Sequence, residues 1–225
     1  MQVMDKLKKN DFVEIKYTGY VNENVFDSNI EEDLKKLDPK SDAKPKKTIV
    51  SIGNRMLVIG LDNALEEKEI GKDYEVEVKA KEGFGERQRE LVKTIPLKVF
   101  REKSIDPRPG MVLNIDNSLA RIITISGARV ITDFNHPLAG KNLKYKFKIE
   151  RKVEDIKEKT ESFFENTLQF KPEFEIKEKT VVVKGPKILG QIVETIKNKF
   201  KELVSADLGF EEKKPETKKE EHKAK

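Results

Sequence analysis

The sequence predicts an α+β protein, and two patterns indicate this class. Segments 12–17, 74–79 and 143–149 alternate apolar and polar residues, as strands with one buried face do. Near the C-terminal end, residues 155–168 and 186–203 repeat apolar residues at helical spacing. Strands over most of the chain, with helices near its C-terminal end, are typical of the α+β class.

The first segment, 1–85, is expected to be mostly β-structure. Pro39 and Pro45 fall in a polar stretch, so 29–47 is interpreted as a long loop with about one helical turn. The expected elements are, in order, a strand over 12–21, a turn at 22–24, a strand at 25–28, this loop, a strand over 48–52, a turn and short helix over 53–65, a strand over 74–79 and a glycine-flanked loop at 81–85.

Residues 86–132 look like an insertion, because the perfectly alternating strand 143–149 returns to the pattern of the first segment. The turn at 106–110 and the pair Ser126-Gly127 divide apolar runs into strand candidates at 111–115, 121–125 and 128–132. The sequence therefore predicts a small β-rich domain here.

Four units follow from these breaks. They are a discontinuous domain of 1–85 plus 133–154, an inserted domain of 86–132, a C-terminal α+β domain of 155–210, and a disordered charged tail of 211–225. The C-terminal domain has two amphipathic helices in about 55 residues, a marginal core for independent folding. Self-association through this domain, giving a homodimer, is therefore one expectation.

Charge and composition exclude several classes of function. The chain has 225 residues, a net charge of +5, no Cys and two distant His residues, His136 and His222. Disulfides, thiolate chemistry and a histidine metal cluster are thereby excluded, and neither a metal nor a cofactor is expected. No apolar run reaches the length of a membrane span and no signal peptide is evident, so we expect a soluble cytoplasmic protein. Heavy use of Lys, Glu and Ile, with few Gln, suggests a thermophile.

The basic excess lies mostly in the insert, which holds nine basic and five acidic residues. The other units are neutral or nearly so. No aromatic-basic alternation of the kind that binds RNA occurs there, which argues against nucleic acid as a partner.

Several short motifs, which follow one another in a fixed order along the chain, resemble those of the FKBP-type peptidyl-prolyl cis-trans isomerases. The resemblance is specifically to the SlyD-like branch, which has a chaperone domain inserted in the flap. The motifs are Tyr17-Thr18-Gly19, Phe26-Asp27-Ser28, Ile52-Gly53, Leu57-Val58-Ile59-Gly60-Leu61, Gly83-Phe84-Gly85 and the segment 135–143. The resemblance covers about 1–154, and the extra C-terminal domain is similar to a long archaeal form. It implies an antiparallel sheet wrapped on a short helix near 57–65.

By this resemblance the active site is an apolar bowl. Its residues would be Tyr17, Phe26, Asp27, Leu57, Val58, Leu61, Phe84, Leu138 and Tyr145. Asp27 would be the one carboxylate of the wall, and the backbone N–H of Val58 would bind a substrate carbonyl. Leu61 stands where the family often has Trp, and Phe84 where it usually has Tyr. The nickel-binding tail of SlyD proteins is not carried over, because only His222 is present.

Each of these residues also has an ordinary structural explanation. Tyr17, Phe26 and Tyr145 alternate on strands, so each fits a core position, and Asp27 fits a turn. His136 is interpreted as a hydrogen-bonding residue of a loop.

The insert is expected to bind unfolded or nascent chains that contain X–Pro bonds. Its apolar residues are too many for so small a core, so some should line an exposed surface that pairs with extended chains. The candidates are Leu91, Val92, Ile95, Val99, Phe100, Met111 and Leu113. The leading hypothesis is thus an isomerase and folding chaperone. The alternatives are a non-catalytic holdase with a decayed pocket, and a ribosome- or RNA-associated factor.

Overall fold

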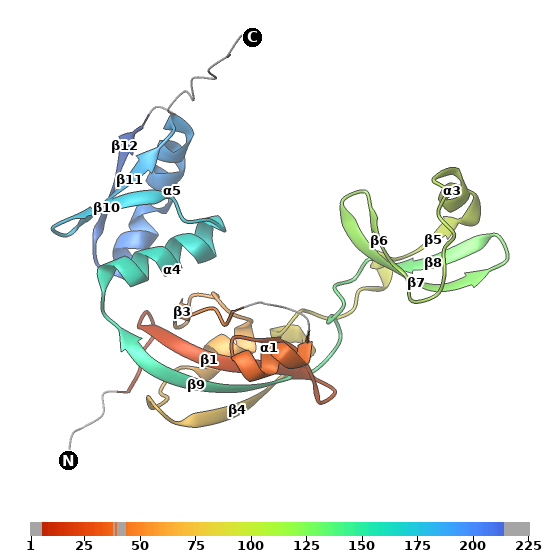
Figure 1. Cartoon of the computed structure of the whole chain (residues 1–225), viewed down its shortest axis with the longest axis horizontal. Coiled ribbons are helices and arrows are strands. Elements are labelled where there is room, and N and C mark those ends of the chain that lie inside the picture. The colour runs from red at the N-terminus through yellow and green to blue at the C-terminus, as the bar shows by residue number, and fades with distance from the viewer. Residues whose placement is uncertain (1–5, 38, 40–43, 214–225) are drawn as a thin grey trace, which may run out of the picture.

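The computed structural model describes residues 6–37, 39 and 44–213, and these form three separate sheets, each with at least one helix against it (Figure 1). A curved sheet forms the core domain, a second sheet forms the insert, and a third belongs to the C-terminal domain. The fold class predicted from the sequence is confirmed. No helix in the described part of the chain combines the length and apolar character needed to cross a membrane.

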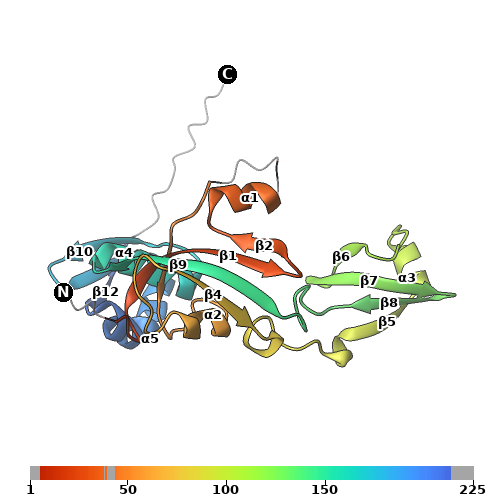
Figure 2. The same ribbon diagram turned by 90° about the horizontal axis from the view of Figure 1, so that it is seen from below.

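The core domain is an antiparallel sheet of strand order β2-β1-β9-β4, with β3 paired to the first half of β1. Its strands are β1 Phe12–Val21, β2 Asn24–Ser28, β3 Thr48–Ser51, β4 Asp73–Val78 and β9 Leu143–Val153. Helix α2, Ile59–Ala64, lies against one side of the sheet, and α1, Glu31–Leu37, lies on the other (Figure 2).

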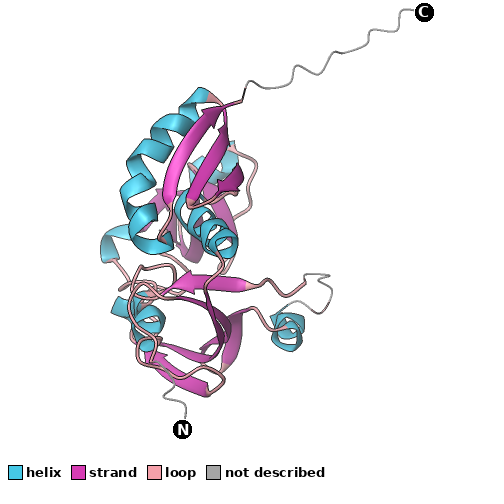
Figure 3. Cartoon of the chain, turned by 90° about the vertical axis from the view of Figure 1, so that its left-hand side faces the viewer, coloured by secondary structure: helices cyan, strands magenta, loops and turns pink. Residues whose placement is uncertain are grey.

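Alternation on β1 explains why the sheet has two different faces. Val13 and Ile15 point into the core beneath α2, whereas Lys16 and Thr18 point to the side of α1. Seen from its end, the sheet curves around α2 (Figure 3). The polar stretch 29–47, expected to hold about one helical turn, instead contains the seven-residue helix α1. Acidic residues in its first turn and lysines in its last turn suit the helix dipole.

The insert leaves the core domain after the short 3₁₀ helices at Ala80–Glu82 and Arg89–Leu91. It is a four-stranded antiparallel sheet of order β5-β8-β7-β6. Its elements are β5 Val92–Pro96, α3 Leu97–Glu102, β6 Val112–Ile115, β7 Ser118–Ser126 and β8 Arg129–Asp133. Its buried apolar core consists of Phe100, Ile122 and Val130. Helix α3 was not predicted from the sequence; it is a short helix without a side-chain cap.

The C-terminal domain begins directly after β9, with Asp155 capping the first helix by accepting a hydrogen bond from the N–H of Glu158 at 2.8 Å. Its elements are α4 Ile156–Leu168, β10 Glu173–Lys177, β11 Thr180–Gly185, α5 Lys187–Val204 and β12 Asp207–Glu212. Strand β12 pairs in parallel with β11.

Strand β12 corrects the prediction of a disordered tail over 211–225. Glu211 and Glu212 belong to the strand, because their backbones pair with Lys184 and Gly185. The remainder of that prediction, 214–225 with His222, lies outside the described residues.

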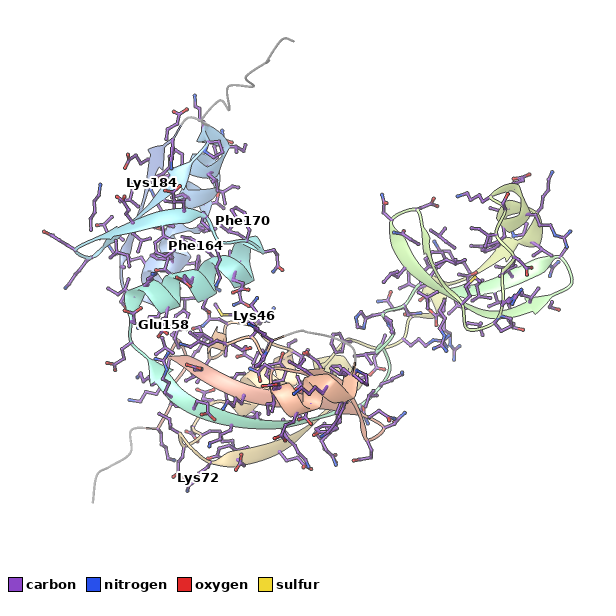
Figure 4. All side chains as sticks on the ribbon, viewed as in Figure 1. Lys46, Lys72, Glu158, Phe164, Phe170 and Lys184 are labelled. Carbon is purple, nitrogen blue, oxygen red and sulfur yellow. The ribbon has the colours of Figure 1, made fainter. Side chains whose placement is uncertain are left out.

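The core and C-terminal domains share one hydrophobic cluster. Phe12 on β1 and Val153 on β9 are cross-strand partners, and both are buried among C-terminal residues such as Phe163 and Phe200. Ile49 and Met56 of the core domain pack against the same cluster. The hydroxyl of Ser162 on α4 donates to the carbonyl oxygen of Ile49 at 2.6 Å. We call this shared cluster the seam. Polar side chains lie around it, among them the labelled Lys46 and Glu158 (Figure 4).

Candidate active site

A cavity of about 390 Å³ opens between the concave side of the core sheet and the start of α2. Its lining consists of Tyr17, Asp27, Arg55, Met56, Leu57, Val58, Leu61, Phe84 and Tyr145. The cavity therefore gathers residues from β1, β2, β9, the segment before α2 and the loop after β4. A larger groove of about 550 Å³ lies on the α1 side of the sheet, has many charged residues and shares none of this lining.

Aromatic rings form one wall of the cavity. The ring centroids of Tyr17 and Tyr145 lie 6.2 Å apart. Phe26 presents its ring edge-on to Tyr145 at 5.8 Å and to Phe84 at 6.0 Å. Gly19 makes this cluster possible, because a Cβ at that position would lie 2.8 Å from Phe26 and 2.9 Å from Tyr145. The wall is thus a packed aromatic cluster with one open side.

One carboxylate reaches this wall. The hydroxyl of Tyr17 donates to Oδ2 of Asp27 at 2.9 Å. Burial, the charge of Asp27 and this hydrogen bond raise the pKa of Tyr17, and burial followed by the charge of Asp27 raises the pKa of Tyr145. Both phenols therefore stay protonated at neutral pH, and the hydroxyl of Tyr17 is held as a donor.

The residues that follow Asp27 fix its position. Asn29 is buried, accepts from the N–H of Tyr17 at 2.8 Å and donates to the carbonyl oxygen of Ile15 at 2.7 Å. Ser28 donates to the carbonyl oxygen of Tyr17 at 3.0 Å. These bonds tie β2 to β1, so Asp27 lies on a strand rather than in the turn that its residue type alone suggested.

The segment before α2 forms the floor and is held by a buried carboxylate. Asp62 accepts from the N–H groups of Gly53 at 2.9 Å and of Arg55 at 2.8 Å. Leu61 is buried beneath the cavity. The N–H of Val58 donates to no other described residue, so it is available to a ligand. Arg55, Met56 and Asp62 were not among the site residues predicted from the sequence.

The structure gathers all but two of the predicted bowl residues around the cavity. Phe26 lies behind the lining, where it supports Phe84 and Tyr145. Leu138 does not line the cavity, because it belongs to the turn in which its N–H bonds to Nδ1 of His136 at 3.2 Å. The imidazole of His136 instead stacks on Phe84, with centroids 4.4 Å apart and planes 7° from parallel. His136 is thus a neighbour of the cavity wall as well as a hydrogen-bonding residue of the loop.

The predicted chain-binding residues of the insert differ in how much of their surface is open to a ligand. The prediction for Phe100 is corrected, because this side chain is buried in the core of the insert and is not available to a ligand. Ile95, Met111 and Leu113 pack against that core with part of their surface open. Leu91 and Val92 are half-buried at the base of the insert, and Val99 is exposed on α3. The most exposed apolar side chains, Val112, Leu119 and Ile123, were not among the residues selected.

The cavity has no Cys, Ser or His in its lining, and its chemistry is that of an apolar surface with a carboxylate and a free N–H. Among the described residues, no group of three or more His, Cys, Asp or Glu side chains is arranged to hold a metal ion. Such a site can bind a polypeptide and change its conformational preference without forming a covalent bond.

Comparison with known proteins identifies the class. Residues 4–99 match the family of FKBP-type peptidyl-prolyl cis-trans isomerases, and residues 93–138 match the FKBP26 IF domain. A short-type peptidyl-prolyl cis-trans isomerase of Methanocaldococcus jannaschii is 33% identical over 150 residues, which is 65% of this chain and 94% of that protein. The SlyD isomerase of Haemophilus influenzae is 38% identical over 98 residues, 41% of this chain and half of the SlyD protein. The chain belongs to the FKBP-type peptidyl-prolyl cis-trans isomerase family and is an enzyme of that type, in its SlyD-like branch with an insert in the flap.

Proposed function

We propose that the cavity accelerates rotation about X–Pro bonds by binding the twisted amide more tightly than the planar one. Rotation has a barrier of about 18–20 kcal/mol, because the planar amide has partial double-bond character. The twisted state loses this resonance and its charge separation, so an apolar site favours it. Each tenfold acceleration requires about 1.4 kcal/mol of preferential binding, and no proton transfer or nucleophile is needed.

Individual residues have distinct roles in this proposal. The prolyl ring lies on Leu61 between the rings of Tyr17, Phe84 and Tyr145. The N–H of Val58 donates to a substrate carbonyl oxygen and orients the chain. Asp27, held by Tyr17, faces the carbonyl carbon or the N–H groups of the substrate.

We further propose that the insert captures unfolded chains and raises their concentration at the cavity. Val112 and Leu119 support this proposal, because they are 57% and 64% exposed on one side of the insert sheet. Strand β6 forms an edge of that sheet, where an extended chain can add as a further strand. Capture makes the encounter with the cavity intramolecular, so weak binding in the cavity suffices.

The observation that carries the whole proposal is the contact between Phe84 and His136. Phe84 lines the cavity, and His136 lies on the segment that returns from the insert, three residues after β8. A chain held at the base of the insert is therefore beside the cavity wall.

Substitution of Asp27 tests the role of the cavity. Asp27→Ala should lower the turnover of a short proline peptide about 10- to 100-fold, the effect of one charge-assisted hydrogen bond. The matched control is Asp33→Ala, because Asp33 pairs with Thr18 on the α1 side of the sheet and should leave turnover unchanged. A wild-type protein that fails to accelerate the peptide would favour the alternative, a holdase with a decayed cavity.

Substitution of the exposed apolar pair tests capture. Val112→Ser with Leu119→Ser should slow catalysis of proline-limited refolding and leave turnover of the short peptide unchanged. Ile70→Ser is the control, because Ile70 is an exposed apolar residue of the core domain. Equal losses with both substrates would contradict capture.

We also propose that the C-terminal domain pairs with a second copy of the chain. Phe170, Ile176 and Ile188 support this, because they are large apolar residues exposed on that domain. Light scattering on the full chain should give the mass of a dimer, and Ile188→Lys should give a monomer. A monomer at high wild-type concentration would contradict the pairing.

A further inference from the structure

A second cavity, of about 410 Å³, lies where the insert joins the core domain. Its insert side includes Val112, Leu119 and Arg121, and its core side includes His136, Pro137 and Lys141. We call it the junction groove. Its lining includes Arg87 on one of the two segments that link the core domain to the insert and Asn135 on the other. Figure 1 shows these two linking segments.

The charge of the junction groove is positive. Its one carboxylate, Asp133, is already neutralised, because Arg87 donates to it at 3.0 and 2.8 Å. Burial opposes the charge of Asp133, but hydrogen bonds from Asn135 and Arg87 outweigh burial and lower its pKa. Arg121 and Lys141, by contrast, form no ion pair with any carboxylate that the structure describes. Two free cations therefore face the groove.

Apolar surface lies directly beside these cations. Val112 on β6 is the cross-strand partner of Arg121 on β7, and Leu119 lies two residues before Arg121 on the same face. The groove thus offers apolar contact and positive charge side by side.

The junction groove also adjoins the active site. His136 belongs to its lining, and the imidazole of His136 also stacks on Phe84 of the active-site wall. A residue of the groove therefore contacts a residue of the active-site wall, so the two sites are neighbours that one extended chain could reach together.

We infer that the junction groove selects client segments that combine acidic and apolar side chains near the proline. This inference rests on the proposed capture function and adds the chemical class of the client. Extended polypeptide suits the groove better than nucleic acid does, because no unstacked aromatic ring lies in the described lining to hold a base. Arg121 and Lys141 would pair with the acidic side chains, and Val112 and Leu119 would contact the apolar ones.

Proline peptides with charged arms test the inference. Three peptides share one X–Pro bond and an apolar arm that carries glutamate, lysine or serine. Wild-type protein should turn over the glutamate peptide about fivefold more efficiently than the serine peptide, as two exposed ion pairs allow. Arg121→Glu should reverse the order of the glutamate and lysine peptides, and Lys141→Glu should do so independently if Arg121→Glu disturbs folding. Added salt should reduce the preference.

Lys98→Glu is the matched control. It changes the charge of the insert by the same amount, but Lys98 lies on α3 and does not line the groove, and its one ion pair among the described residues is with Glu102. It should leave the preference unchanged. Equal effects of Lys98→Glu and Arg121→Glu, or no preference in the wild type, would overturn the inference. Displacement of the glutamate peptide by single-stranded RNA at lower concentration than by free peptide would also overturn it.

Failure of the inference is distinguishable from failure of capture. If all three armed peptides outperform an unarmed tetrapeptide equally, capture holds and charge selection is wrong. If arms of any charge give no advantage, capture itself is wrong.

Discussion

The insert and the C-terminal domain are attached to the same core domain by different kinds of contact. The C-terminal domain shares a hydrophobic cluster with the core domain through Phe12 and Val153. The buried residues of the insert cluster all belong to the insert, and polar contacts such as Arg87 with Asp133 connect its two linking segments. Within the linkers, the N–H of Gln88 donates to Oδ1 of Asn135 at 2.8 Å, and that of Gly140 donates to the carbonyl oxygen of Gly85 at 2.8 Å.

The two kinds of attachment have different consequences for stability and for motion of the attached unit. A hydrophobic seam couples the folding of two units, because separating them exposes apolar surface to water. A polar junction leaves each unit its own core, so the insert can unfold or move while the core domain stays folded. The unit for which we propose client capture is thus the one that shares no hydrophobic cluster with the core domain.

Two buried phenylalanines should show the largest difference. Phe12→Ala should lower the free energy of unfolding by about 3–5 kcal/mol, because it opens a cavity in the shared cluster. Phe100→Ala should unfold the insert and leave turnover of a short proline peptide intact. Denaturant titration followed by tyrosine fluorescence measures the first effect, because all four tyrosines lie in the core domain. Hydrogen exchange of the insert amides, together with peptide turnover, measures the second. Loss of peptide turnover in Phe100→Ala would show that the insert is not independent.

Met56 should connect the seam to the active site. Its side chain packs against both hydrophobic clusters and lines the active-site cavity, and its sulfur accepts from the N–H of Ser51 at 3.2 Å. Met56→Ala should cost about 2 kcal/mol of stability and also lower peptide turnover. Met56→Leu, which preserves volume, should restore most of both. Normal turnover in Met56→Ala would show that the C-terminal domain does not influence the cavity.

Thr132 offers a stabilising test of the insert. Its hydroxyl is the one buried side-chain oxygen without a hydrogen-bond partner among the described residues. Thr132→Val removes this polar group and keeps the shape of the side chain, so the free energy of unfolding of the insert should rise by about 1 kcal/mol. Hydrogen exchange of the insert amides should slow, whereas exchange in the core domain should not change. Faster exchange in the insert would contradict the expectation.

The ion pairs around the seam should contribute least to the free energy of unfolding. Hydrogen bonds from Lys47 and Arg151 lower the pKa of Glu158, against a smaller opposing effect of burial. Since its folded pKa is depressed, the contribution of Glu158 is present above the unfolded pKa of about 4.3 and is lost as pH falls through the folded pKa. Glu158→Gln should cost less than about 1 kcal/mol at neutral pH, because the pairs are exposed. The variant and the wild type should become equally stable in acid, and a constant difference at all pH values would contradict this account.

Local patterns in the sequence predicted the core domain better than the other units. Alternation located β1, β4 and β9, and ordered landmarks located most of the cavity lining. Phe12 is an apolar residue on the side of β1 that otherwise carries polar residues such as Glu14 and Lys16. This exception in the pattern indicated a second contact surface, but no prediction was based on it. That side is covered by the C-terminal domain at Phe12, which no local pattern shows.

The remaining elements depend on contacts between distant residues. Strand β12 is stabilised by parallel pairing with β11, and α5 separates these two strands in the sequence. The local sequence does not show this pairing, and the charged end of the strand, Glu211 and Glu212, was therefore assigned to a tail. Arg55 and Met56 line the cavity because the carboxylate of Asp62 fixes their backbone. Leu138 was misplaced because its turn directs His136, not Leu138, toward Phe84.

Deletion of residues 87–132 tests the central claim most directly. The deleted chain and the full chain are compared in two assays, turnover of a short proline peptide and catalysis of proline-limited refolding. Catalysed refolding should fall far more than peptide turnover, because the cavity belongs to the core domain and the proposed capture surface belongs to the insert. Equal losses in the two assays would contradict the claim that the insert feeds clients to the cavity.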